Sequence, residues 1–400
     1  MSTMVLTNRL ELSSSADTAL KVAARFWFII AVIGQWLFAF YVAASYGISG
    51  IQGHFTAWNK GAHRYIPGDT VGNIAIAAHL FIAVIILAGG PLQLIPQIRS
   101  KAPRFHRWNG RFYIPAVFMT SLAGLYLVWV RGTIGDVVQH LGVSLDAVLI
   151  MIFSVLALRS ALARDFRTHG RWALRLFMVV NGVWFFRIGL MLWILINKGP
   201  VGFDSQTFTG PFISFLSYAN YLLPLAVLEL YLWTKEQPGA LRRFAMATVL
   251  GVLTLGMAVG VFAATKVLWI PRVKAAYDGR QSIAETLSAT IAASGIDAAA
   301  AQYRHLKATA ATAYNFDKDE LNTLGYDLIR AKKFKEAIQI LALNVEAYPH
   351  WSNAYDSLGE AYMDDGNKPL AIANYQKSLQ LNPANHGAVL AIQKLSGTRP

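Results

Sequence analysis

The sequence contains no cysteine, and this absence removes several kinds of site at once. Without thiols the chain can form neither disulfides nor thiolate metal sites, and it lacks the cysteine pair through which c-type haem is attached. Any metal ion in this protein would therefore be held by histidine, carboxylate or methionine side chains.

Charged residues are also scarce, because only 14% of the 400 residues are charged, whereas 55% are hydrophobic. This composition is atypical of a soluble domain and typical of a protein that lies largely in lipid. The net charge of +14 comes from lysines and arginines that occur in short clusters between apolar runs. That pattern is typical of membrane topology and excludes a nucleic-acid-binding surface.

Seven apolar runs approach or exceed the roughly 20 residues that a membrane-spanning helix needs. They extend over residues 24–48, 71–98, 112–130, 137–158, 172–196, 208–233 and 244–269. Basic residues concentrate in the loops after the second, fourth and sixth runs. The positive-inside rule therefore predicts a multi-pass protein of the bacterial inner membrane, with a cytoplasmic segment at 1–23 and an extracytoplasmic chain after Trp269.

The predicted fold class is all-α, with a polytopic bundle of about seven transmembrane helices at 24–270. A helical linker with a degenerate repeat is predicted at 271–317, and a soluble repeat domain with a capping helix at 318–400. An offset of 34 residues superposes Leu324 on Leu358, Gly325 on Gly359, Ala337 on Ala371 and Pro349 on Pro383. This offset matches the tetratricopeptide pattern, which predicts either a surface that docks a protein partner or a domain that only adds stability.

Four of the nine histidines lie near the starts of successive predicted helices. His79 and His140 enter from the outer side, whereas His106 and His169 lie at the inner face. Alternate helices of an antiparallel bundle share a face, so the sequence predicts two facing pairs, His79 with His140 and His106 with His169. Bis-imidazole ligation of haem b needs one histidine from each of two helices. Two haems stacked across the membrane would form an electron path.

Basic residues around His106 fit this interpretation, because Arg104, Arg107 or Arg111 could pair with haem propionates. The simpler alternative is that His106 and His169 are interfacial anchors, which also produce juxtamembrane arginine, tryptophan and histidine. His79 lies well inside a spanning helix, where an ionisable residue is a functional candidate by default. An interhelical hydrogen bond is its competing explanation.

Two further ionisable residues lie at equal predicted depth in the membrane. Asp146 is about ten residues from the outer start of its helix and Arg187 about ten from the outer end of the next, so both are roughly 15 Å deep. We expect them to be partners, either as a buried pair that fixes helix register or as groups that handle a proton or a cofactor.

The remaining histidines have no specific spacing. His54 and His63 are predicted to lie in a plain outer loop, and His305, His350 and His386 on the surface of the tail. No phosphate-binding loop, catalytic triad order or metalloprotease motif occurs. These observations give no support to nucleotide binding or hydrolysis.

The stretch HLFIAVIILAGGPLQLIPQIRSKAPRFHRWNGRFYI, from His79 to Ile114, resembles a bacterial family of predicted membrane proteins known as domain of unknown function 2306. That resemblance covers the second to fifth predicted helices and implies no established activity. The four-histidine arrangement is also similar to transmembrane di-haem cytochromes of the b-561 type, which implies His79, His140, His106 and His169 as haem ligands.

Three functions follow as hypotheses. The first is a haem b protein that passes electrons from a quinone or another reductant to an extracytoplasmic acceptor, with the repeats docking a protein partner. The second is a non-enzymatic scaffold or assembly factor that is anchored in lipid and acts through its repeats. The third is a transporter that uses Asp146 and Arg187, although no broken helix or inverted repeat is evident from the sequence.

Overall fold

The computed structural model describes residues 2–53, 55, 58, 65–66, 68–132, 135–204, 208–278 and 280–397. The chain divides into a membrane unit, residues 1–196 and 202–276, and a C-terminal unit, residues 197–201 and 277–400. The described residues are almost entirely helical, and the two short strands β1 (Gln281–Ser282) and β2 (Tyr314–Asn315) pair in parallel. The all-α class predicted from the sequence is confirmed.

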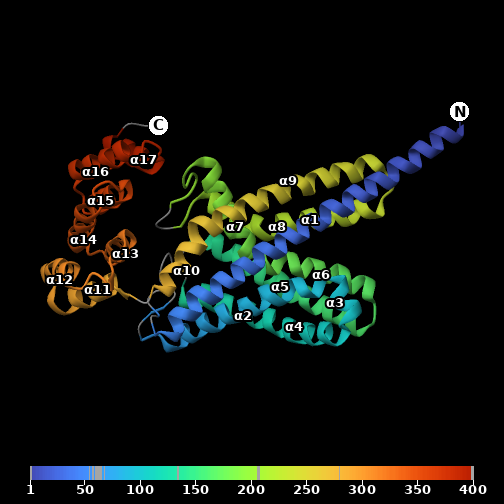
Figure 1. The fold of residues 1–400 in the computed structure, drawn as a ribbon, viewed down its shortest axis with the longest axis horizontal. Coiled ribbons are helices and arrows are strands. Elements are labelled where there is room, and N and C mark those ends of the chain that lie inside the picture. Colours follow the sequence, from blue (N-terminus) through green and yellow to red (C-terminus); the bar gives the residue numbers. More distant parts are fainter. Residues whose placement is uncertain are drawn as a thin grey trace. The chain divides into compact units, whose positions relative to one another are not determined.

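The membrane unit contains six helices that are long and apolar enough to cross a bilayer, and a seventh span when the bent pair α6 and α7 is counted as one. This agrees with the predicted number of runs. In chain order its elements are α1 (Ser2–Ile51), α2 (Thr70–Leu94), α3 (Pro96–Lys101), α4 (Pro103–Tyr126), η2 (Leu127–Arg131), α5 (Val137–Leu162), α6 (Phe166–Val180), α7 (Gly182–Asn197), α8 (Pro211–Glu236), α9 (Ala240–Ala264), η3 (Thr265–Trp269) and α10 (Ile270–Tyr277) (Figure 1).

Local sequence explains where several of these helices begin. The side chains of Asp69, Asp136 and Asp165 each accept a hydrogen bond from a backbone N–H in the first turn of α2, α5 and α6. An aspartate at this position satisfies a donor that the helix leaves without an internal partner. Helices α3, α4 and α8 instead begin with proline, whose missing N–H costs nothing there.

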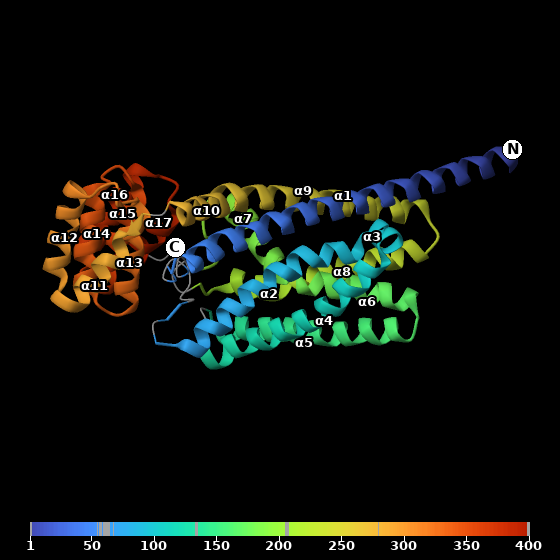
Figure 2. The ribbon, with the colours of Figure 1, turned by 60° about the horizontal axis from the view of Figure 1, so that its bottom comes forward.

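Helix α1 runs alongside α9, and both views of the ribbon show the two side by side (Figures 1 and 2). Their close approach depends on Gly34, because a Cβ there would lie 2.6 Å from the Trp184 ring and 2.8 Å from Val261 Cγ2. Helix α2 packs on α4, α4 on α5, and α5 on α6. Buried aromatic side chains, among them Trp184 and Trp269, fill the space between α1, α7 and α9.

The span formed by α6 and α7 is broken, with a bend of 50° at Asn181. This break was not evident from the sequence. The Asn181 side chain donates to the Phe177 carbonyl at 2.7 Å and so occupies an acceptor at the end of α6. Gly182 then starts α7, and the Asn-Gly pair permits the change of direction.

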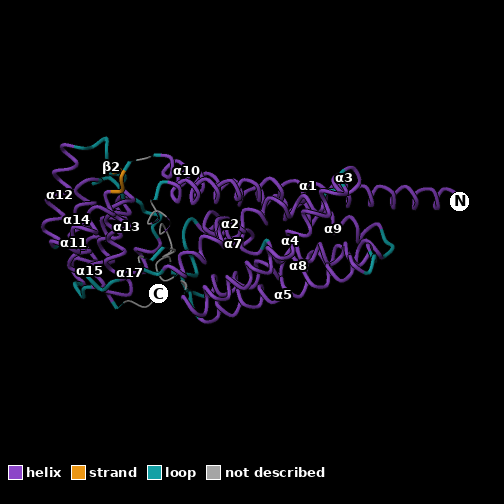
Figure 3. Tube along the Cα trace, turned by 90° about the horizontal axis from the view of Figure 1, so that it is seen from below, coloured by secondary structure: helices purple, strands orange, loops and turns teal. Residues whose placement is uncertain are grey.

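The C-terminal unit consists mainly of helices, and Figure 3 shows them with loops and the short strand β2 between them. Helix α15 (Ser352–Asp364) begins and ends 34 residues after α13 (Lys318–Arg330), and α16 (Lys368–Leu381) likewise follows α14 (Phe334–Ala347). Helices α11 (Ile283–Ser294) and α12 (Ile296–Thr309) precede them, and α17 (His386–Ser396) follows. The repeat offset seen in the sequence is therefore also the offset of the helices.

The same glycine contact occurs twice in these helix pairs. A Cβ at Gly325 would lie 2.5 Å from the Leu341 side chain, and one at Gly359 would lie 3.1 Å from the Tyr375 ring. Both glycines face residues that are also 34 positions apart. Each glycine thus allows the two helices of its pair to approach closely.

Candidate functional site

Two histidines lie at the basic end of the membrane unit, in the first turns of α4 and α6. His106 is partly buried, and its Nδ1 has no hydrogen-bond partner among the described residues. The backbone carbonyl of His106 accepts a hydrogen bond from Gln93 Nε2 at 3.2 Å. Nδ1 of His169 lies 2.9 Å from the carbonyl oxygen of Ala157, which belongs to the neighbouring helix α5. That contact fixes the plane of the His169 imidazole.

The structure brings these two imidazoles within electrostatic range of one another, and Arg99 and Arg107 lie in range of His106. The Arg111 guanidinium stacks 5.1 Å from the centre of the Trp108 ring, where a cation–π contact holds it. Of the arginines named from the sequence, Arg107 is therefore in range of His106, and Arg99 of α3 joins it.

His79 lies in the interior of the membrane unit, where α2 packs on α4. The His79 ring lies beside the Thr120 main chain, and its Cε1 is 3.9 Å from the point where a Gly124 side chain would begin. His79 Nδ1 is buried and has no hydrogen-bond partner among the described residues. Arg187 is in electrostatic range of the ring.

His140 has different surroundings, close to the start of α5. Its ring meets the indole of Trp129 edge to face, with 5.9 Å between the ring centres. The carbonyl of His140 accepts from Ser144 Oγ, which in turn accepts from Trp129 Nε1. The described contacts of His79 are thus to α4 and α7, whereas those of His140 are to η2 and its own helix.

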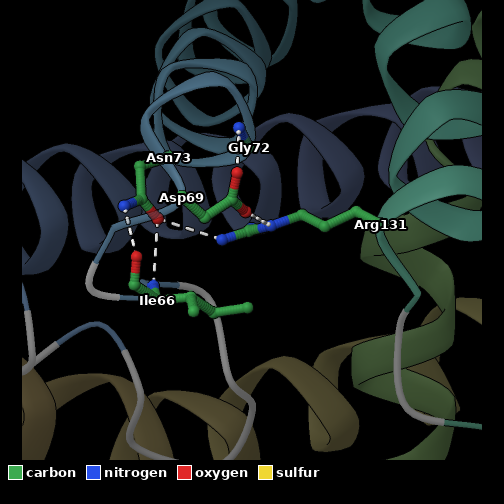
Figure 4. A network of polar contacts seen from close by, with 5 residues as sticks. All are labelled: Ile66, Asp69, Gly72, Asn73 and Arg131. Atoms are coloured by element: carbon green, nitrogen blue, oxygen red, sulfur yellow. Dashed lines mark hydrogen bonds and ion pairs between the residues drawn. The ribbon is translucent and has the colours of Figure 1, made fainter.

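A polar clamp joins the start of α2 to the end of η2 (Figure 4). Arg131 donates from Nε to Asp69 Oδ2 at 2.8 Å and from Nη2 to Asn73 Oδ1 at 3.0 Å. Asn73 also pairs with the backbone of Ile66. The Gly72 N–H and the Arg131 guanidinium lower the pKa of Asp69 below its ordinary value. The clamp fixes the register of α2, which carries His79, against α4.

The structure does not join Asp146 to Arg187, and the expected pair is a wrong prediction. Arg187 donates to the Val183 carbonyl at 3.0 Å and stacks 4.9 Å from the centre of the Phe38 ring. It therefore faces α1. Asp146, only 9% exposed, faces the break between α6 and α7. The two side chains leave their helices in different directions.

A group of polar residues surrounds Asp146 at that break. Asn220 and Asp146 both direct an oxygen at Gly182, and Tyr221 donates to the Gly142 carbonyl at 3.1 Å. Sequence reasoning missed Asn181 and Asn220, although each is an amide inside an apolar run and Asn181 precedes a glycine. That combination is a signal for a helix break and could have found this site.

Sequence reasoning also missed the partner of Glu229, to which it assigned no role. Arg175 donates from Nε and Nη2 to the two carboxylate oxygens of Glu229 at 2.6 and 2.8 Å, and its guanidinium stacks on Trp172. His54 and His63 lie outside the described residues, as does the side chain of His386. In the described part of the chain, no group of three or more histidine or carboxylate side chains is placed to hold a metal ion.

Comparison with known proteins gives one match. Residues 76–211 match the family described as Predicted membrane protein (DUF2306), which confirms the resemblance noted in the sequence. The matched segment contains all four histidines, Asp146 and Arg187. No curated protein and no solved structure matches the chain. The chain is an integral membrane protein that carries a domain of this family over residues 76–211.

Proposed function

We propose that this protein binds haem b in the membrane and passes electrons across it. The observation that carries the proposal is the hydrogen bond between His169 Nδ1 and the Ala157 carbonyl, with a second imidazole, that of His106, in electrostatic range. The fit of a cofactor can be judged from these two side chains, because an iron porphyrin requires only two axial ligands from the protein.

A carbonyl can only accept, so Nδ1 of His169 carries the proton and Nε2 carries the lone pair. A ring nitrogen that donates to a backbone carbonyl is the usual support of a metal-ligating histidine, because it fixes the tautomer and the ring orientation. His106 Nδ1 is buried without a described partner, so that imidazole has a nitrogen to offer. An interfacial anchor needs neither arrangement.

The positive charge near His106 also favours haem as the bound group. Haem propionates are anionic, and Arg99, Arg107 and Arg111 lie on α3 and the first turns of α4. Arginine binds carboxylates with two parallel hydrogen bonds and stays charged. When bound, haem would supply the one-electron chemistry, while these residues hold and orient it.

A second haem in the outer half of the bundle is part of the proposal. His79 would be one ligand, because its Nδ1 is buried without a described partner and Gly124 presents no side chain to the ring. His140 would be the other ligand, and its edge-to-face contact with Trp129 supports its orientation. The donor would be a quinone or another reductant, and the acceptor would be extracytoplasmic.

The orientation is proposed from charge. Helices α4 and α6 begin among arginines, and the inner membrane of a bacterium would hold that end at the cytoplasm. The N-terminus would then be cytoplasmic and the C-terminal unit extracytoplasmic.

The test is the visible spectrum of purified variants produced with haem available. His169→Ala and His106→Ala should each lose the signal of one haem, and His79→Ala that of the other. His305→Ala is the matched control, because His305 is an exposed residue of the C-terminal unit. Wild-type absorbance in His169→Ala would remove the inner assignment.

A second candidate function, partner docking or scaffolding through the C-terminal unit, is favoured by the repeated glycine contacts. Gly325 against Leu341 and Gly359 against Tyr375 have the spacing of tetratricopeptide repeats, whose stacked helices present a concave binding surface. Deletion of residues 277–400 should leave the haem spectrum intact and abolish co-purification of an envelope protein. Equal co-purification by the shortened chain would contradict this role.

A further inference from the structure

The break between α6 and α7 places two oxygen atoms opposite one another in the middle of the membrane unit. Asn220 Oδ1 lies 2.6 Å, and Asp146 Oδ2 2.8 Å, from the point at which a Gly182 side chain would begin. Glycine has no side chain at this point, so the amide of α8 and the carboxyl of α5 both border the first residue of α7.

The orientation of the Asn220 amide is fixed by hydrogen bonds on its other side. Its Nδ2 donates to the carbonyls of Leu216 and Ser217 at 2.8 and 2.7 Å. Both donor hydrogens are thereby used, and the atom turned towards Asp146 is the acceptor Oδ1. Reversing the amide would leave two carbonyls facing an oxygen.

An ionised Asp146 would therefore place a second acceptor near Asn220 Oδ1, while the amide donors of Asn220 are used elsewhere. Asp146 is 9% exposed, and its Oδ1 has no hydrogen-bond partner among the described residues. Tyr221, a titratable group in electrostatic range of Asp146, donates its hydroxyl to the Gly142 carbonyl. Arg187 faces α1 instead. A buried charge with neither a counter-ion nor donors is costly, so this contact requires a proton or a cation.

We propose that Asp146 is a proton-binding site, and that its protonated carboxyl donates to Asn220 Oδ1 at the broken helix. Metal cations such as Mg²⁺ and Ca²⁺ take about six or more oxygen ligands, whereas two side chains converge here. A proton needs only one donor and one acceptor. The site is independent of the haem proposal, and none of the four histidines contributes to it.

The position of the site at a break gives the proton a way to be exchanged. Irregular backbone at membrane depth is tolerated where it is enclosed by protein or lines a cavity, and broken helices supply binding groups in transporters. Asn220 also lines an apolar cavity of about 690 Å³ among α1, α6, α7, α8 and α9. Movement of α7 about Asn181 would separate Gly182 from the two oxygens and open the carboxyl.

The groups that face Asp146 set its pH dependence. Tyr221 lies in electrostatic range of it on α8, and Asn181 and Gly182 stand at the break between α6 and α7. None of these is charged near neutral pH. A pH-dependent signal from this site therefore belongs to Asp146.

The experiment is infrared spectroscopy of the full-length protein in lipid, recorded for wild type and for Asp146→Asn. The difference spectrum at pH 7 should contain the carbonyl band of a carboxylic acid, which shifts in D₂O. Asp165→Asn is the matched control, because asparagine also caps a helix and hydrogen bonds from Thr168 lower the pKa of Asp165, so no acid band should be lost. Asn220→Leu should retain the band and shift it to higher wavenumber.

Two outcomes would overturn the proposal. One is a carboxylate signal from Asp146 at pH 7, and the other is an acid band that disappears when Na⁺ is added at constant pH. Asp146→Asn should fold, since its amide can donate to Asn220 as the protonated acid does, and it should melt no lower than wild type. Its haem content should also equal that of wild type, which separates a failure here from a failure of the haem proposal.

Discussion

Carboxylates at the ends of the membrane helices differ from the one in the middle. Near the helix ends, Asp17 pairs with Arg243, Asp69 with Arg131 and Glu229 with Arg175, at distances of 2.6 to 2.8 Å. Asp146 in the middle faces an amide oxygen and has one oxygen without a described partner.

The difference separates two uses of acidic residues in a membrane. Each pair at the ends joins two helices through opposite charges, and water nearby reduces the cost of burying them. The central carboxyl joins α5 to α8 only if it is neutral. Pairing therefore indicates a structural role, whereas burial without a counter-ion indicates a group that carries a proton.

The largest effect should come from filling the central site. Gly182→Val would place a side chain within 2.6 and 2.8 Å of the two oxygens, and overpacking of this kind costs about 1–3 kcal/mol. Thermal unfolding in detergent should show a marked loss of stability. Gly256→Ala is the control, since its Cβ would meet only Leu192 Cδ2 at 3.6 Å; an equal loss there would contradict the account.

A smaller effect is expected from neutralising a carboxylate that is paired. Glu229→Gln weakens the two-bond contact with Arg175, and pairs that are partly exposed contribute about 0.2–1 kcal/mol. Asp146→Asn should cost nothing, because the carboxyl is already neutral. The measurement is the unfolding curve of each variant at pH 7. If Asp146→Asn were less stable than Glu229→Gln, the distinction between a paired carboxylate and a neutral carboxyl would be contradicted.

Acid should weaken the clamp of Asp69 and Arg131 but leave the central site unchanged. The pKa of Asp69 is lowered in the folded state, so its contribution is complete above the unfolded value of about 3.9. That contribution is lost as the pH falls through the folded pKa. Melting temperature against pH should therefore fall more steeply for wild type than for Asp69→Asn. Parallel curves would show that the clamp adds no stability.

The smallest effect should come from the exposed pair of Arg304 and Glu346 in the C-terminal unit. Their side chains are 60% and 64% exposed, so Glu346→Gln should change the stability by less than about 0.5 kcal/mol. Denaturant unfolding measures this change. A larger loss of stability would mean that the exposure of an ion pair does not indicate how much the pair stabilises this protein.

Much of the fold could be predicted because its signals are local. Apolar runs indicated the spans, and an offset of 34 residues indicated the helix pairs α13–α14 and α15–α16. The bend at Asn181 could not be placed by hydropathy, because the apolar run continues through it. It depends on a side-chain hydrogen bond to Phe177 and on the glycine that follows.

The candidate site was predictable only in part. Sequence position placed His106 and His169 near the starts of their helices, and both lie in the first turns, of α4 and of α6. The direction of a side chain around its helix depends on packing, and this is why Arg187 faces α1 and not Asp146. The proximity of Asn220 to Asp146 could not be predicted, because it depends on how α8 packs against α5.

The most direct test of the central claim is a reduced-minus-oxidised visible spectrum of the detergent-purified protein, with a pyridine haemochrome count. The protein should be produced with haem available. The account predicts b-type haem in the wild type, and one haem fewer in His169→Ala than in His305→Ala. A protein that folds but contains no haem under several expression conditions would contradict it, and the C-terminal unit would then carry the function as a scaffold.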